Sequence, residues 1–103
     1  MKNTVHKLEL NNGEVIDLTL TFARILKVKN HNKKLYESFM NALKNKDFDP
    51  LLDSAKVVYV AYLCGFNDDL GNALSEEEFL EELPMDLTVI NQIVADLINP
   101  KKK

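Results

Sequence analysis

Histidine, cysteine and clustered carboxylates are the residue types in this chain that could carry chemistry. Its two histidines, His6 and His31, fall on separate predicted elements, and neither has the i, i+4 partner of a helical metal pair. We expect His6 to be a partly buried structural residue on the inner face of an N-terminal hairpin. The single cysteine, Cys64, lies in an apolar stretch, where a thiol is usually an inert small hydrophobe. These residues predict no catalytic or metal site, so we do not expect an enzyme.

Acidic residues gather in the segment SEEEFLEEL, residues 75–83. Carboxylates at the start of a helix are explained by the helix dipole, without any catalytic role. The overlapping segment from Phe66 to Phe79 resembles a calcium loop, but placing Gly71 at loop position 6 puts Phe66 and Leu70 where calcium needs oxygen ligands. The three glycines form no phosphate-binding motif. We therefore expect no metal, nucleotide or other cofactor.

Composition indicates an ordinary globular domain. The chain has 103 residues, a net charge of −3 and 46% hydrophobic residues, which suits one modest core and gives no global basic field for nucleic acid. Its first residues lack the apolar segment of a signal peptide. The longest apolar run, from Val57 to Cys64, is too short to span a bilayer. We expect a soluble intracellular protein that binds neither membrane nor nucleic acid.

The segment LELNNGEVIDLTL, residues 8–20, predicts a β-hairpin, because apolar and polar residues alternate on both sides of an Asn-Asn-Gly turn. A two-residue turn would put the apolar residues of the two strands on opposite faces. A three-residue loop at 11–13 pairs Leu8 with Ile16 and brings all of them onto one face. We therefore predict a type I turn followed by Gly13 in the left-handed conformation, which forms a bulge.

Capping signals predict four to five short helices after the hairpin. The third of them reads LLDSAKVVYVAYLC and is apolar nearly all round in its second half, so it should be the most buried helix. We expect it to end at Gly65 in a left-handed C′ position. Pro84 should limit the fourth helix to about two turns. The predicted start signals are Thr21, Asn32, Asp49 with Pro50, Ser75 with Glu78, and Asp86.

These elements predict a mainly α protein with a small N-terminal antiparallel β-hairpin packed on the helical bundle, an α+β architecture. We expect a single domain over residues 1–103, with the hairpin at 4–22, the helical body at 23–99 and a basic tail at 100–103. A lone hairpin is marginally stable and leaves two unpaired edges. Two interpretations remain open: the edges support self-association or capture of another chain, or the hairpin only covers the helical core.

Charge is distributed unevenly along the chain. Seven basic residues and one acid lie between Arg24 and Lys46, whereas twelve acids and one base lie between Asp47 and Asn99. One interpretation is that two solvated faces attract each other within the fold. The other is that these patches steer association with neighbouring copies or with a partner.

The order of elements is similar to that of the tail assembly chaperones of long-tailed, siphovirus-type phages and related prophages. The resemblance covers nearly the whole chain. It is carried by the segments LELNNGEVIDLTLTFARILKV, LYESFMNAL, DPLLDSAKVVYVAYLCGF and LSEEEFLEEL, followed by a final short helix. The family has no invariant catalytic motif, so the resemblance is one of pattern.

The resemblance implies that the chain binds the aggregation-prone tape measure protein and keeps it soluble during tail morphogenesis, without nucleotide hydrolysis. It implies a location in the host bacterial cytoplasm, absence from the mature virion, and the tail tube protein as a further candidate partner. The family often has a longer form made by ribosomal frameshift. The lysines of the NPKKK ending are either encoded by a slippery adenine run or form an ordinary solubilising tail.

Partner binding is expected at apolar residues of two helices, where an amphipathic helix of the tape measure protein would lie in a groove. The candidates are Tyr36, Met40, Ile90 and Ile93, and methionine suits adaptable contacts. The alternative function is a small helical DNA-binding regulator of phage origin. Its recognition helix would have to come from the basic segment Asn30 to Lys46.

Overall fold

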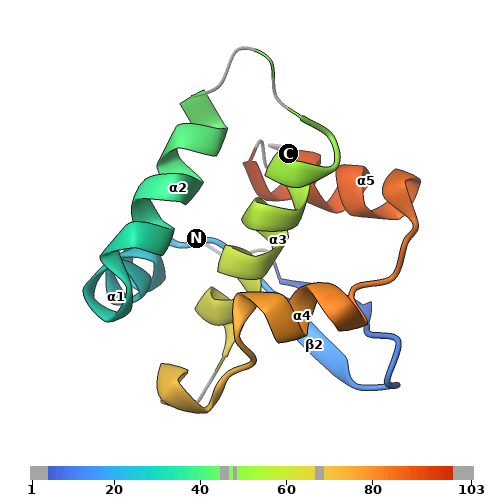
Figure 1. The fold of residues 1–103 in the computed structure, drawn as a ribbon, viewed down its shortest axis with the longest axis horizontal. Coiled ribbons are helices and arrows are strands. Elements are labelled where there is room, and N and C mark those ends of the chain that lie inside the picture. The colour runs from blue at the N-terminus through green and yellow to red at the C-terminus, as the bar shows by residue number, and fades with distance from the viewer. Residues whose placement is uncertain (1–4, 45–46, 48, 67–68, 99–103) are drawn as a thin grey trace.

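The computed structural model describes residues 5–44, 47, 49–66 and 69–98, and within them the predicted order of a hairpin followed by helices is confirmed (Figure 1). The two strands form one antiparallel sheet, and the helices surround α3. The elements are β1 (His6–Glu9), β2 (Val15–Leu18), α1 (Phe22–His31), α2 (Lys33–Lys44), α3 (Leu52–Gly65), the 3-10 turn η1 (Leu70–Asn72), α4 (Glu76–Glu82) and α5 (Leu87–Ile98).

The hairpin has the predicted three-residue loop. Leu8 lies opposite Ile16, and the Leu10 amide donates to the Glu14 carbonyl at 2.8 Å. Gly13 has φ +90°, the positive value that the bulge requires. The four apolar residues at even positions, Leu8, Leu10, Ile16 and Leu18, are all buried. Matching the apolar faces therefore identified the register correctly.

The second strand is shorter than predicted. It ends at Leu18, whereas the hairpin was expected to extend to residue 22. Thr21 instead caps α1, because its side-chain oxygen accepts a hydrogen bond from the Arg24 amide at 3.3 Å. Phe22 consequently begins the helix and is 82% exposed, so it is not part of the apolar hairpin face.

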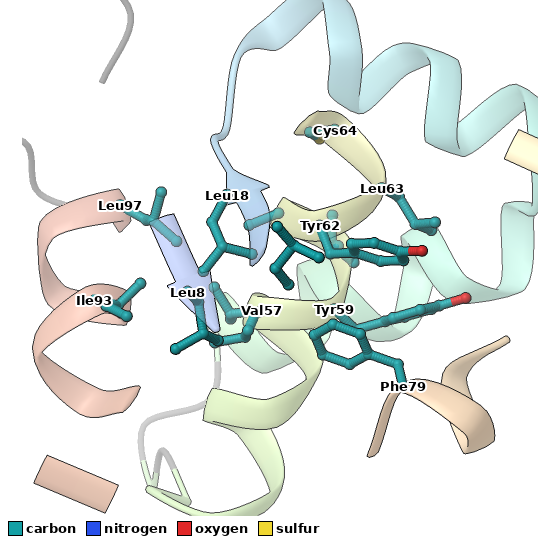
Figure 2. Close-up of a cluster of buried hydrophobic side chains, with 14 of the residues drawn as sticks. Leu8, Leu18, Val57, Tyr59, Tyr62, Leu63, Cys64, Phe79, Ile93 and Leu97 are labelled. Atoms are coloured by element: carbon teal, nitrogen blue, oxygen red, sulfur yellow. The ribbon is translucent and has the colours of Figure 1, made fainter. Parts of the chain in front are cut away.

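Helix α3 forms the centre of the molecule, as its composition predicts. It packs against β2 and against α1, α2, α4 and α5. Every residue from Val57 to Cys64 is buried in one core cluster that also contains residues of the hairpin, α4 and α5. In Figure 2, Val57 lies near Leu8 of the hairpin, and Tyr59 lies beside Phe79 of α4. An all-round apolar helix is stable only when neighbours cover all its faces, and here they do.

The prediction that Gly65 takes a left-handed conformation is wrong. Gly13 is the one glycine of the described residues with positive φ, and Phe66 continues the chain in an extended conformation. Glycine is needed at position 65 for space, since a Cβ there would lie 2.4 Å from the backbone oxygen of Asp17. The end of α3 is held instead by Arg24, whose Nη1 donates to the Cys64 carbonyl at 2.6 Å.

Side-chain caps begin the helices where the sequence predicted them. Asn32 accepts from the Leu35 amide, Asp86 accepts from the Val89 amide, and Ser75 with Glu78 forms a complete capping box. Asp49 accepts from the amides of Leu51 and Leu52, and α3 itself begins at Leu52. With Thr21 at the start of α1, all five predicted start signals make hydrogen bonds at helix N-termini, although α3 begins two residues after Pro50.

Candidate functional site

The groups that could do chemistry are either buried or dispersed. The described residues contain no group of three or more histidines, cysteines and carboxylates that could hold a metal ion. Cys64 is 2% exposed, and desolvation by burial raises the pKa of its thiol to about 11. The thiol therefore stays protonated near neutral pH. His6 is half-buried, and its Nε2 is buried without a hydrogen-bond partner.

The four predicted partner residues do not share one accessible surface. Tyr36 and Met40 are half-buried on α2, with Lys29 Nζ 5.2 Å from the centroid of the Tyr36 ring. Ile90 and Ile93 are 3% and 8% exposed. The apolar stripe of α5 packs against α3, so these two isoleucines belong to the core, and their assignment to an exposed binding surface is corrected.

Ile90 nevertheless lies at the edge of an apolar hollow that the sequence did not reveal. The hollow has a volume of about 240 Å³ and opens where the start of α3, the end of α4 and the start of α5 meet. Among its lining residues, Met85 and Leu52 are 78% and 68% exposed. The lining consists of Leu51, Leu52, Ala55, Leu80, Leu83, Pro84, Met85, Leu87 and Ile90. We call this set the apolar hollow.

Local sequence signals place the walls of the apolar hollow. The Asp49 carboxylate binds the amides of Leu51 and Leu52, which positions both leucines at the first turn of α3. These hydrogen bonds lower the pKa of Asp49. Pro84 follows the end of α4, and Asp86 caps α5, so Met85 lies in the short connection between the two helices (Figure 1).

Acidic residues follow the walls of the apolar hollow. Glu77 and Glu81 are exposed on α4, the helix that contributes Leu80, and Asp86 lies between Met85 and Leu87. The one basic residue between Asp47 and Asn99 is Lys56, which is paired with Glu76 at 2.6 Å. The charged residues that neighbour the lining residues in the chain are therefore mostly acidic, and we call Glu77, Glu81 and Asp86 the anionic rim.

A second hollow, of about 450 Å³, lies between the α1–α2 junction, α3 and the segment around η1. Tyr59 and Leu74 line it, and Tyr59 donates to the Leu74 carbonyl at 2.8 Å. Tyr62, which is not among the lining residues, accepts a hydrogen bond from the Leu74 amide at 2.9 Å. Burial, with a further contribution from Glu76, raises the pKa of Tyr59 to about 12. This neutral tyrosine pair anchors the chain that precedes α4, which is a structural role.

Sequence reasoning missed Leu51, Leu52, Leu80 and Met85 as candidate binding residues. Leu51 and Met85 lie outside the helices, next to Pro50 and Pro84, whereas Leu52 is the first residue of α3 and Leu80 lies near the end of α4. The available signal was an excess of apolar residues in the DPLLDS and ELPMDL segments. That excess identifies a surface only once the three helix ends are known to meet.

No family model, curated protein or solved structure matches this chain. Among the described residues, no helix has the length and apolar character needed to cross a membrane.

Proposed function

We propose that this chain is a phage tail assembly chaperone, a passive protein that binds the tape measure protein and keeps it soluble in the host bacterial cytoplasm. The tail tube protein is a further candidate partner. The observation that supports this function best is the apolar hollow, because it gathers well-exposed leucine and methionine side chains at one junction of three helices. Such a surface suits a partner that contributes apolar side chains of its own.

The size and chemistry of the apolar hollow favour side chains over a small molecule. Small-molecule sites usually have volumes of about 300–1,000 Å³ and a few convergent polar groups. The apolar hollow is smaller, at about 240 Å³, and all nine of its lining residues are apolar. A leucine or methionine from an amphipathic helix needs no polar partner there, so helix-in-groove binding fits the lining.

Co-expression tests the proposed function directly. The tape measure protein, whose gene is expected beside this one as a very long helical reading frame, is expressed with and without this chain. The soluble fraction of the tape measure protein is measured in both cultures. We expect the chain to increase that fraction and to co-purify with the product. Equal solubility in the two cultures would contradict the proposed function.

The alternative of DNA binding has one supporting observation. Lys27, Lys29, Lys33 and Lys34 are all exposed around the α1–α2 junction. Phosphate contacts by these lysines would make DNA binding weaken steeply as salt rises. A DNA mobility-shift assay over a salt series separates the two functions, because a chaperone of this kind should give no shift.

A further inference from the structure

We propose, building on the proposed function, that the apolar hollow selects amphipathic helices whose apolar ridge is flanked by lysine or arginine. The chemical class of the partner segment is thus a basic amphipathic helix. The chaperone role by itself specifies neither the binding surface nor the charge of the segment that binds there.

The first support is the arrangement of exposed apolar side chains. Leu52 comes from the start of α3, Leu80 from α4 and Met85 from the α4–α5 connection, and all three line the same hollow. Binding energy is usually concentrated in a few apolar anchors that fill such a hollow. A helix offers these anchors at i and i+4, which lie on one face about one turn apart.

The second support is the sign of the charge around the apolar hollow. Asp86 lies between the lining residues Met85 and Leu87 in the chain, and Glu77 and Glu81 are exposed within one turn of Leu80 on α4. Lys56 is already paired with Glu76. An incoming helix with acidic flanks would meet like charges, whereas lysine or arginine flanks would meet carboxylates. Complementary charge of this kind raises the association rate and suppresses wrong partners.

The third support is that carboxylates near the apolar hollow also hold the N-termini of the helices that form it. Asp49 binds the amides of Leu51 and Leu52, and Asp86 binds the Val89 amide. The hydrogen bonds from the Leu51 and Leu52 amides lower the pKa of Asp49. Asp49 and Asp86 therefore contribute negative charge beside the same residues that they hold in position.

The test uses two fluorescent amphipathic peptides that share one leucine ridge and differ only in having lysine or glutamate at the flanking positions. Binding to the full chain is measured by fluorescence anisotropy at low salt and at about 0.15 M ionic strength. We expect the lysine peptide to bind at least about tenfold more tightly at low salt, and the difference to shrink as salt screens the rim. Equal affinity for the two peptides, or binding of neither, would overturn the inference.

Variants locate the binding site. Leu52→Ser and Met85→Ser should each weaken binding of the lysine peptide by about tenfold, because each removes an apolar anchor. Glu77→Gln with Glu81→Gln should reduce the preference for lysine over glutamate flanks. The matched control is Phe22→Ser, which removes an equally exposed apolar residue on α1, away from the lining of the apolar hollow. Loss of binding in this control would overturn the assignment of the site.

A second copy of the chain is the competing occupant. Sedimentation across a concentration series would detect this dimer as self-association that Leu52→Ser abolishes, and this outcome would overturn the assignment of a partner helix.

Co-expression separates the proposed function from the proposed binding site. If the Leu52→Ser and Met85→Ser variants still keep the tape measure protein soluble, the binding site is wrong and the chaperone function stands. If the lysine peptide binds at the apolar hollow but the tape measure protein stays insoluble, the chaperone function fails alone.

Discussion

Replacing Gly65 by alanine should destabilise the protein, although alanine is normally the better residue in a helix. A Cβ at this position would lie 2.4 Å from the Asp17 oxygen and 2.9 Å from its carbonyl carbon. Both obstructing atoms are backbone, so no side-chain rotation can relieve the clash, and β2 must move away from α3. Overpacking of this kind costs about 1–3 kcal/mol, and the gain in helix propensity offsets at most about 1 kcal/mol. Because the 2.4 Å contact is with a backbone atom, we expect a cost in the upper part of this range, about 2–3 kcal/mol, and a net loss of about 1–2 kcal/mol in the free energy of unfolding.

Urea unfolding followed by circular dichroism measures this loss, with the slope checked to confirm two-state behaviour. The matched control is Gly71→Ala, whose Cβ would meet its nearest neighbour, the Asp69 Oδ1, at an acceptable 3.4 Å. A Gly65→Ala variant as stable as the parent would refute the reasoning, because α3 and β2 could then not approach as closely as described.

Three further substitutions test the buried Ser54–Asn91 hydrogen bond, the Ser75 cap of α4 and the Tyr59 hydroxyl. Ser54→Ala should cost about 1 kcal/mol in urea unfolding, because it removes the 2.6 Å bond that buried Ser54 donates to Asn91. Ser75→Ala should cost a similar amount, about 1 kcal/mol, and should speed hydrogen exchange of the Glu78 amide, which the serine caps. Since the folded state raises the pKa of Tyr59 to about 12, its contribution to stability is complete below pH 10 and should decline from pH 10 to 12. Thermal unfolding over this range checks the sign, and Tyr59→Phe should flatten the decline.

Most of the fold could be predicted because its signals are local. The hairpin register follows from placing Leu8 and Ile16 on one face, and a one-residue slip would have exposed that face. The starts of the later helices follow from short side chains that bind nearby amides, as Ser75 does with Glu78. The buried position of α3 follows from its composition, since no amphipathic arrangement can hide an all-round apolar helix.

Apart from the end of the second strand, where the cap at Thr21 is local, the errors depend on contacts between segments distant in sequence. Gly65 reads as an ordinary helix terminator until β2 is placed beside it, and only then does its missing side chain become necessary. Ile90 and Ile93 read as a free apolar stripe until α3 covers them. The apolar hollow is the most distant case, because its walls come from three helix ends that no single periodicity connects.

The acidic residues around the apolar hollow fall into two groups, one that caps helices and one that does not, so that protein stability and peptide recognition can be tested separately. Asp49 and Asp86 bind amides at helix N-termini, so replacing either would change the positions of Leu51 and Met85 as well as the charge. Glu77 and Glu81 are exposed on α4, and no cap of the helix depends on either of them. Because Glu77 lies in the first turn of α4, neutralising these two glutamates should cost no more than about 0.3–1 kcal/mol through the helix dipole, while it reduces the preference for a basic peptide. A large loss of stability in that variant would mean that the anionic rim belongs to the fold and not to recognition.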